Sequence, residues 1–127
     1  GDANIGDQNL TNPNNYRSIR FADVLLMAAE AHNESGNDAP AQTYVNRVRQ
    51  RAGLGETTAT GGDLSDVIYL ERRLELVGEG HQFFDAVRKG KAAQEISGFQ
   101  NGKHEIFPIP EIEIQLTGNR WAQNPGY

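Results

Sequence analysis

The stretch that most constrains the fold runs from residue 63 to residue 90 and places two acidic side chains within an apolar helical face. At about 3.6 residues per turn, Glu71 and Glu75 share a face with a set of apolar residues and one glycine: Leu64, Val67, Ile68, Leu74 and Gly78. Carboxylates are costly to bury unless each finds a cation or several hydrogen-bond donors. We therefore predict that the two glutamates form a polar clamp that braces the following bend, Gly78-Glu79-Gly80.

The cations for this clamp would be arginines, whose planar guanidinium groups suit paired contacts with carboxylates. Seven arginines are candidates: Arg20, Arg47, Arg49, Arg51, Arg72, Arg73 and Arg88. If the partner of Glu75 is a buried arginine, replacing Glu75 by alanine is expected to destabilise the fold by about 3 kcal/mol or more.

Composition excludes several classes of protein. The chain has 127 residues and no cysteine, so it has no disulfide, thiol nucleophile, cysteine-based metal site or lipidated cysteine of its own. A net charge of −5 argues against a surface for nucleic acid or anionic lipid. No apolar run approaches the roughly 18 residues needed to cross a bilayer. The polar start at Gly1 favours part of a longer protein over a complete small one.

Helical periodicity predicts two helices that form a hairpin. Residues 1–15 have loop chemistry, and a helix is expected from about Ser18 to Glu34. A second helix begins at Asn37 or Asp38 and ends before Gly53. The first helix has an apolar face at helical spacing: Phe21, Val24, Leu25, Ala28, Ala31 and His32. Leu26, Met27 and Ala29 widen this apolar surface, so that only Asp23, Glu30 and Asn33 should stay outside. A pair of about 34 residues is the size of one tetratricopeptide unit, and such units need neighbours to be stable.

The polar parts of the middle region are expected to stay outside the core. On the second helix, the polar residues Gln42, Asn46, Arg49 and Gln50 should face away from the core, and the loop 55–62 has too little apolar content to pack. Asp63 should cap the next helix. A short helix over 82–89 should turn Phe83, Phe84 and Val87 inward.

The C-terminal region has a different character. The prolines of Phe107-Pro108-Ile109-Pro110 favour extended backbone, residues 111–116 favour a helical turn, and the end is irregular. The fold class we expect is all-α: a tetratricopeptide-like helical hairpin plus further helices and an irregular, loop-rich C-terminal tail.

Five blocks of the sequence resemble, in order, segments of the SusD/RagB family of outer-membrane nutrient-binding lipoproteins. They are IRFADVLLMAAEAHNESG (19–36), VNRVRQRAGL (45–54), ERRLELVGEGHQFFDAVRKGK (71–91), FPIPEIEI (107–114) and QNPGY (123–127). Gln82 and Ala86 depart from the usual arginine and leucine. Because family members are several times longer, the resemblance implies that residues 1–127 are a C-terminal portion, with a loop lead-in at 1–15 and a helical region and tail at 16–127.

The resemblance also implies a role. It is that of a protein at the surface of the outer membrane, held by an N-terminal lipid that this chain lacks, which binds an oligo- or polysaccharide without transforming it. The expected partner is a SusC-like TonB-dependent transporter, and no cofactor is expected. Two alternatives stay open: a helical-repeat adaptor that binds a protein partner, and, more weakly, a carbohydrate-active enzyme.

Candidate site residues were weighed against structural roles. The carboxylate pairs Glu71/Glu75 and Glu79/Asp85 could serve acid–base chemistry, but the nearby arginines favour ion pairs. The histidines, His32, His81 and His104, lack metal-binding spacing. Sugar-binding chemistry is present at Trp121 with Asn119 and Gln123, and at Tyr69 and Tyr127, although Trp121 more plausibly covers the core. No catalytic, metal or glycan-binding residue is assigned from sequence.

Overall fold

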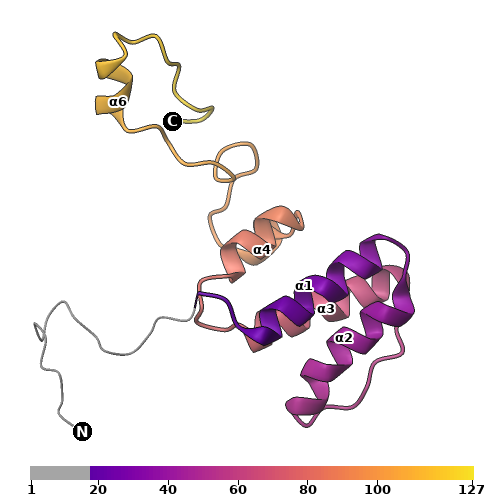
Figure 1. Cartoon of the computed structure of the whole chain (residues 1–127). Helices are drawn as coiled ribbons and strands as arrows, with labels where there is room; N and C mark the ends of the chain where they lie inside the picture. The colour runs from indigo at the N-terminus through magenta and orange to yellow at the C-terminus, as the bar shows by residue number, and fades with distance from the viewer. Residues whose placement is uncertain (1–17) are drawn as a thin grey trace, which may run out of the picture. The chain divides into compact units, whose positions relative to one another are not determined.

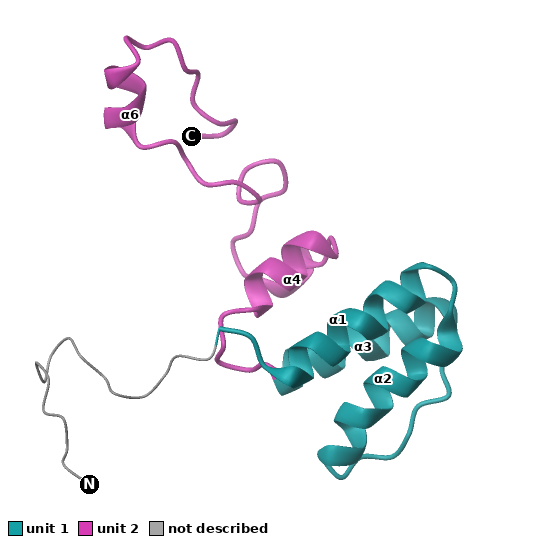
Figure 2. Cartoon of the chain, in the orientation of Figure 1, with its two compact units in different colours: residues 1–75 teal, residues 76–127 magenta. Residues whose placement is uncertain are grey.

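The computed structural model describes residues 18–127, which contain helices and no strand. The chain divides into two compact units, residues 1–75 and residues 76–127 (Figure 2). The first unit holds α1 (Phe21–Glu34), α2 (Asp38–Arg51) and α3 (Gly61–Glu75). The second holds α4 (Gln82–Arg88), α5 (Ala92–Glu95) and α6 (Glu111–Leu116). In the described part of the chain, no helix combines the length and apolar character that a membrane crossing requires.

The first unit is built on a hairpin of α1 and α2, with α3 packed against both (Figure 1). A tight turn at Ser35–Asn37 joins the first two helices, as predicted, and the predicted all-α fold with a tetratricopeptide-like hairpin is confirmed. The core takes small and branched side chains from all three helices: Leu25, Leu26, Ala29, Ala41, Val45, Val48, Leu64 and Ile68. Alanines at the helix contacts let the backbones approach closely.

The buried face of α1 differs from the predicted one. Leu26 and Ala29 are fully buried, whereas Phe21 and Val24 are exposed. The sequence of α1 is apolar around most of its circumference, so periodicity alone could not select the face that meets α2 and α3. Asp23, expected outside, is buried. The helix also begins at Phe21, three residues later than predicted.

The loop after α2 is held by polar side chains of that helix, which corrects the prediction that they face away. The Gln42 amide donates to the carbonyl of Ala59 at 2.8 Å, and the Asn46 amide donates to the carbonyl of Thr57 at 3.0 Å. Ala59 also packs against the core. The side chains of α2 therefore satisfy backbone groups of the loop that would otherwise need water. These hydrogen bonds hold the loop although it has few apolar side chains.

The start of α3 lies three residues earlier than a cap at Asp63 would place it, so Asp63 is in the first turn of the helix. The N–H of Gly61 instead donates to the Asp38 carboxylate at 2.8 Å, and that carboxylate also accepts from Asn33 at 2.9 Å. An acidic group at a helix N-terminus is favourable because unpaired N–H groups and the helix dipole both attract negative charge.

The apolar face of α3 is also only partly as predicted. Leu64 and Ile68 are buried in the core, but Leu74 is exposed. Tyr69 and Arg72 are buried as well. The buried surface of α3 therefore changes along the helix, from aliphatic in its first half to ionic in its last turns.

The second unit begins with the predicted bend. Gly78 and Gly80 both have positive φ angles, 80° and 84°, which side chains with a Cβ rarely adopt. In α4, Phe83 is partly buried but Phe84 is 63% exposed, so the prediction that both turn inward is wrong for Phe84. Phe83 instead contacts Phe99, with ring centroids 6.2 Å apart.

The tail forms the predicted helical turn, α6, and the preceding residues 107–110 lie outside any helix. Three side chains near the end fasten this segment. The Gln123 amide exchanges two hydrogen bonds of 2.8 Å with the backbone of Ile109. Asn124 donates to the carbonyl of Phe107, and the Tyr127 hydroxyl donates to the carbonyl of Ile106 at 3.1 Å. These bonds explain how an irregular end with little apolar burial keeps a defined course.

Candidate functional site

The carboxylate of Glu75 lies at the last residue of α3 between two arginines. Arg20 donates to Glu75 Oε1 at 3.0 Å and, through its other terminal nitrogen, to the backbone carbonyl of Glu75 at 2.9 Å. Arg51, at the end of α2, forms an ion pair with the second carboxylate oxygen. A guanidinium on the last carbonyls of a helix also complements its dipole. The predicted clamp is thus present and fixes the end of α3.

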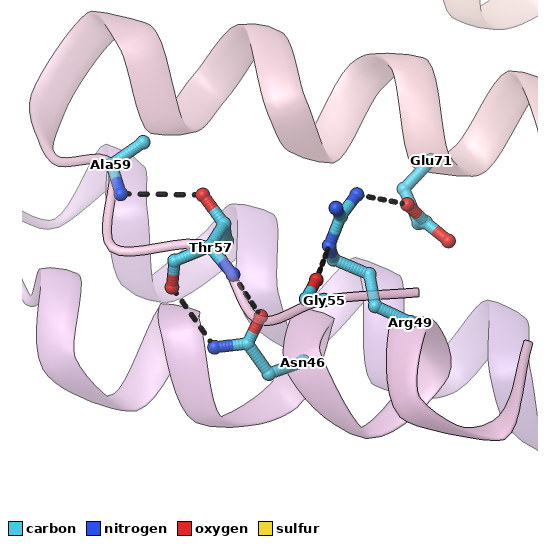
Figure 3. A network of polar contacts seen from close by, with 6 residues as sticks. All are labelled: Asn46, Arg49, Gly55, Thr57, Ala59 and Glu71. Atoms are coloured by element: carbon cyan, nitrogen blue, oxygen red, sulfur yellow. Dashed lines mark hydrogen bonds and ion pairs between the residues drawn. The ribbon is translucent and has the colours of Figure 1, made fainter. Parts of the chain in front are cut away.

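Glu71 belongs to a second network that links α3, α2 and the loop between them (Figure 3). Arg49 Nη1 lies 2.9 Å from Glu71 Oε2, and Arg49 Nε donates to the carbonyl of Gly55 at 2.9 Å. Beside it, the Asn46 amide accepts from the N–H of Thr57 at 2.8 Å and donates to the same residue's carbonyl. One arginine and one amide therefore connect the loop to both helices.

A fourth ion pair, between Arg72 and Asp23, is not predicted by the sequence pattern. Arg72 Nη1 lies 2.8 Å from Asp23 Oδ1, and only 5% and 7% of the two side chains are exposed. Arg72 had been named as a candidate clamp residue, but Asp23 had been placed outside. The sequence feature that could have indicated this pair is an acidic residue beside an apolar helical face, in a chain with several arginines to which no partner had been assigned.

These contacts give the paired acids a structural role. Glu71 is 4% exposed and its carboxylate is committed to Arg49, while Glu75 is held by two guanidinium groups. Asp85 forms an ion pair of 2.8 Å with Arg88, one turn further along α4. The prediction that arginines pair with Glu71 and Glu75 is confirmed. The condition that the partner of Glu75 is a buried arginine is not met. Arg20 and Arg51 are 28% and 62% exposed, so Glu75 does not pair with a buried arginine.

The arginines also set the ionisation of Glu75. Partial burial by itself raises the pKa of this carboxyl, but hydrogen bonds from Arg51 and Arg20 and their positive charges outweigh it. The net pKa of Glu75 is lower than its ordinary value, so the carboxylate is ionised at neutral pH. A glutamate in this state forms ion pairs with cations and is poorly suited to donate a proton.

The aromatic and histidine candidates occupy separate places. Tyr69 is buried, and the ring of Tyr127 lies 4.9 Å from the Lys103 ammonium. Trp121 is 53% exposed, contrary to the expectation that it covers the core. His32 stacks on Tyr44, with ring centroids 5.5 Å apart.

His104 accepts the N–H of Gln100 at 3.0 Å, and its ring meets that of Phe99 at 5.7 Å between centroids. Across residues 18–127, no three side chains of the metal-ligating types converge on one point.

An open groove lies where α1 and α2 meet. It has a volume of about 590 Å³ and combines apolar side chains with arginines at its edge: Ile19, Arg20, Phe21, Ala22, Leu25, Arg47, Val48 and Arg51. Sequence reasoning did not locate this groove, because it had assigned Phe21 to the core.

Comparison with known proteins agrees with the helical architecture. The sequence model of the SusD family matches residues 2–106. SusD-like protein P2 from Formosa agariphila is 32% identical over 96% of this chain, and SusD-like protein P25 from the same organism is 45% identical over 78% of it. The chain spans only 28% and 22% of the lengths of these relatives.

Solved structures are similar as well. A SusD-like protein from Bacteroides fragilis superposes with a TM-score of 0.77 at 28% identity, covering 87% of this chain and 25% of that protein. A SusD homologue from Bacteroides thetaiotaomicron gives 0.75 at 34% identity, covering 85% and 25%. The five ordered sequence blocks, the helical hairpin and the match over most of the chain agree, and the chain belongs to the SusD family.

Proposed function

We propose that residues 1–127 are the C-terminal portion of a bacterial surface lipoprotein that binds a nutrient glycan. In this proposal, the glycan passes unmodified to a SusC-like TonB-dependent transporter in the outer membrane. The observation that carries the proposal is the family match over residues 2–106. The order of the five sequence blocks supports the C-terminal placement, and the chain spans about a quarter of the solved structures, as a portion of a longer protein would.

Binding without chemistry is supported by the state of the two glutamates. A glycosidase needs one carboxyl that donates a proton and a second carboxylate that attacks the sugar or activates water. Glu71 and Glu75 are instead oriented by Arg49, Arg20 and Arg51. Ion pairing directs the oxygens of both carboxylates at guanidinium groups, which leaves them in a framework role.

Calorimetric titration of the whole natural polypeptide with a panel of oligosaccharides tests the proposal. We expect heat of binding for at least one glycan and no new reducing ends after long incubation. Release of reducing ends that is abolished in Glu71→Gln, with the fold retained, would establish the enzyme alternative. The adaptor alternative predicts no glycan binding at all and capture of a protein other than the transporter.

The transporter is tested separately by purification of the polypeptide from outer membranes in mild detergent. We expect a TonB-dependent transporter to co-purify with it in stoichiometric amount. A polypeptide that is recovered alone under conditions where known transporter complexes survive would refute this part of the proposal without affecting glycan binding.

A further inference from the structure

The sequence contains a single Asn-Gly pair, Asn101-Gly102, and it lies in a turn of the second unit. Both residues are exposed and lie outside any helix. The carbonyl of Gln100 closes the turn by accepting from the N–H groups of Lys103 at 3.2 Å and His104 at 3.1 Å. Gly102 has a φ angle of 79°, in the left-handed region that favours glycine. The fold therefore holds this pair on the surface in a turn that depends on glycine.

An asparagine before a glycine is the pair most open to intramolecular deamidation, because glycine has no Cβ to keep its backbone nitrogen away from the asparagine side chain. Within residues 18–127, the side chain of Asn101 forms no hydrogen bond that would hold it in another orientation. A Cβ built on Gly102 would meet no atom within 4 Å, so the space beside this backbone is open. The side-chain carbonyl carbon of Asn101 therefore has free access to the nitrogen of Gly102.

We propose that Asn101 is a site of spontaneous deamidation and that the carboxylate of Glu105 slows the reaction. The Gly102 nitrogen attacks Cγ of Asn101, so that a new N–Cγ bond forms and the Cγ–Nδ2 bond breaks. Ammonia leaves with the proton of the Gly102 N–H. Water then opens the succinimide ring at either carbonyl, which gives aspartate or isoaspartate. The reaction involves no glycan and is independent of the proposed function.

The hydrogen bond between Gly102 and Glu105 is the feature that slows the reaction. The Gly102 N–H donates to Glu105 Oε1 at 2.9 Å. The nitrogen has to lose this proton to attack, and a carboxylate acceptor both holds the proton and opposes a second negative charge beside it. The same hydrogen bond is the largest of the causes that lower the pKa of the Glu105 carboxyl, so Glu105 is charged at neutral pH.

Either product changes the turn. Aspartate and isoaspartate both add a negative charge close to Glu105, and isoaspartate also adds a methylene group to the main chain. That insertion falls between Gln100 and the two N–H groups that its carbonyl accepts, those of Lys103 and His104. We expect faster hydrogen exchange at these two amides in the isoaspartyl form, because the hydrogen bonds that close the turn no longer fit.

Timed incubation of the whole natural polypeptide at mildly basic pH tests the site. Peptide mass spectrometry detects the small mass increase of an amide that becomes an acid, and chromatography separates aspartyl from isoaspartyl peptides. Asn119 is the reference in the same digest, because it is also exposed but is followed by an arginine. We expect much faster conversion at Asn101 than at Asn119, with isoaspartate among the products. Equal rates at the two sites would overturn the proposal, and so would aspartate as the sole product, since direct hydrolysis forms no isoaspartate.

The role of Glu105 is tested by comparing Glu105→Ala with Glu113→Ala, which removes an exposed carboxylate of α6. Loss of the hydrogen bond should raise the rate at Asn101 about threefold to tenfold in Glu105→Ala and leave it unchanged in Glu113→Ala. Circular dichroism checks that both variants keep their helices. Equal rates in the folded variants would overturn the role of Glu105. In urea the two should react alike, and a difference that persists there would assign the effect to the local sequence and overturn the role of the folded turn.

Discussion

The buried pair of Arg72 and Asp23 gives the sharpest prediction about stability. Replacing Asp23 by alanine leaves a guanidinium group that is 5% exposed without the carboxylate that lies 2.8 Å from it. Removing one partner of a buried ion pair costs about 3–5 kcal/mol, chiefly because the remaining charge stays desolvated. Arg72 keeps other contacts, so we expect a loss near the lower limit, about 3 kcal/mol.

The comparison that isolates this cause is a double replacement. In Asp23→Leu/Arg72→Met both charges are removed together and apolar groups of similar size take their places. Burial of an ion pair contributes little net stability relative to such a replacement. We therefore expect the double variant to be within about 1 kcal/mol of the natural sequence. Glu113→Ala on α6, an exposed carboxylate, is the control for loss of one negative charge, with an expected change within about 0.5 kcal/mol.

Urea unfolding followed by far-ultraviolet circular dichroism measures these differences, and thermal unfolding provides a second readout. A loss of about 3 kcal/mol corresponds to a fall in Tm of roughly 6 °C or more. Because the pair is shielded from solvent, the loss should be nearly the same at low and high salt. The reasoning fails if Asp23→Ala unfolds with the midpoint of Glu113→Ala, or if the double variant is destabilised as much as the single one.

Three further predictions concern the other polar contacts. Glu75→Ala should destabilise by about 1–2 kcal/mol, less than a buried partner would require. Because the Glu75 pKa is lowered, this contribution is full above the pKa of the unfolded chain and is lost as the pH falls through the folded pKa; Glu75→Gln should flatten the acid limb of a stability-versus-pH curve. Asn46→Ala should cost about 1–3 kcal/mol and increase hydrogen exchange at Thr57, whereas Thr43→Ala should not. Gln123→Ala should increase exchange at the Ile109 amide with little change in global stability, and a protected amide in that variant would contradict the proposed fastening of the tail.

Much of the helical pattern could be predicted because it depends on residues that are close together in the sequence. The turn after α1, the start of α2 and the bend at Gly78 depend on residue types within a few positions. The choice of buried face was less accessible. Leu26 and Phe21 are both large and apolar, and only the packing of α2 and α3 decides that the first is buried and the second exposed.

Polar contacts between distant residues were predicted where a carboxylate stood out and missed where it did not. Glu71 and Glu75 interrupt an apolar stripe, so the need for arginines was visible in the sequence. Asp23 lies near the start of a helix, where acidic residues are common and need no special explanation. Its partner is 49 positions away, and no local rule links the two. The fastening of the loop by Asn46 was missed for the same reason.

The ionic contacts of the first unit are concentrated on the last turns of α3, and this distribution has a physical cause. The first half of α3 packs through Leu64 and Ile68 into a core that α1 and α2 can fill with aliphatic side chains. Beyond that point, the three acidic and basic residues of α3 that are sequestered pair with different elements: Glu71 with α2, Arg72 with α1, and Glu75 with both Arg51 and Arg20.

Directional contacts of this kind orient a helix more strictly than aliphatic packing, because each guanidinium donates to carboxylate oxygens only in its own plane. They are also costly to leave half made. A helix end held in this way is a poor place for acid–base chemistry, since a carboxylate that took part in proton transfer would have to give up a contact that orients the helix. The residues that looked most catalytic in the sequence are therefore those whose ion pairs hold the end of α3 in place.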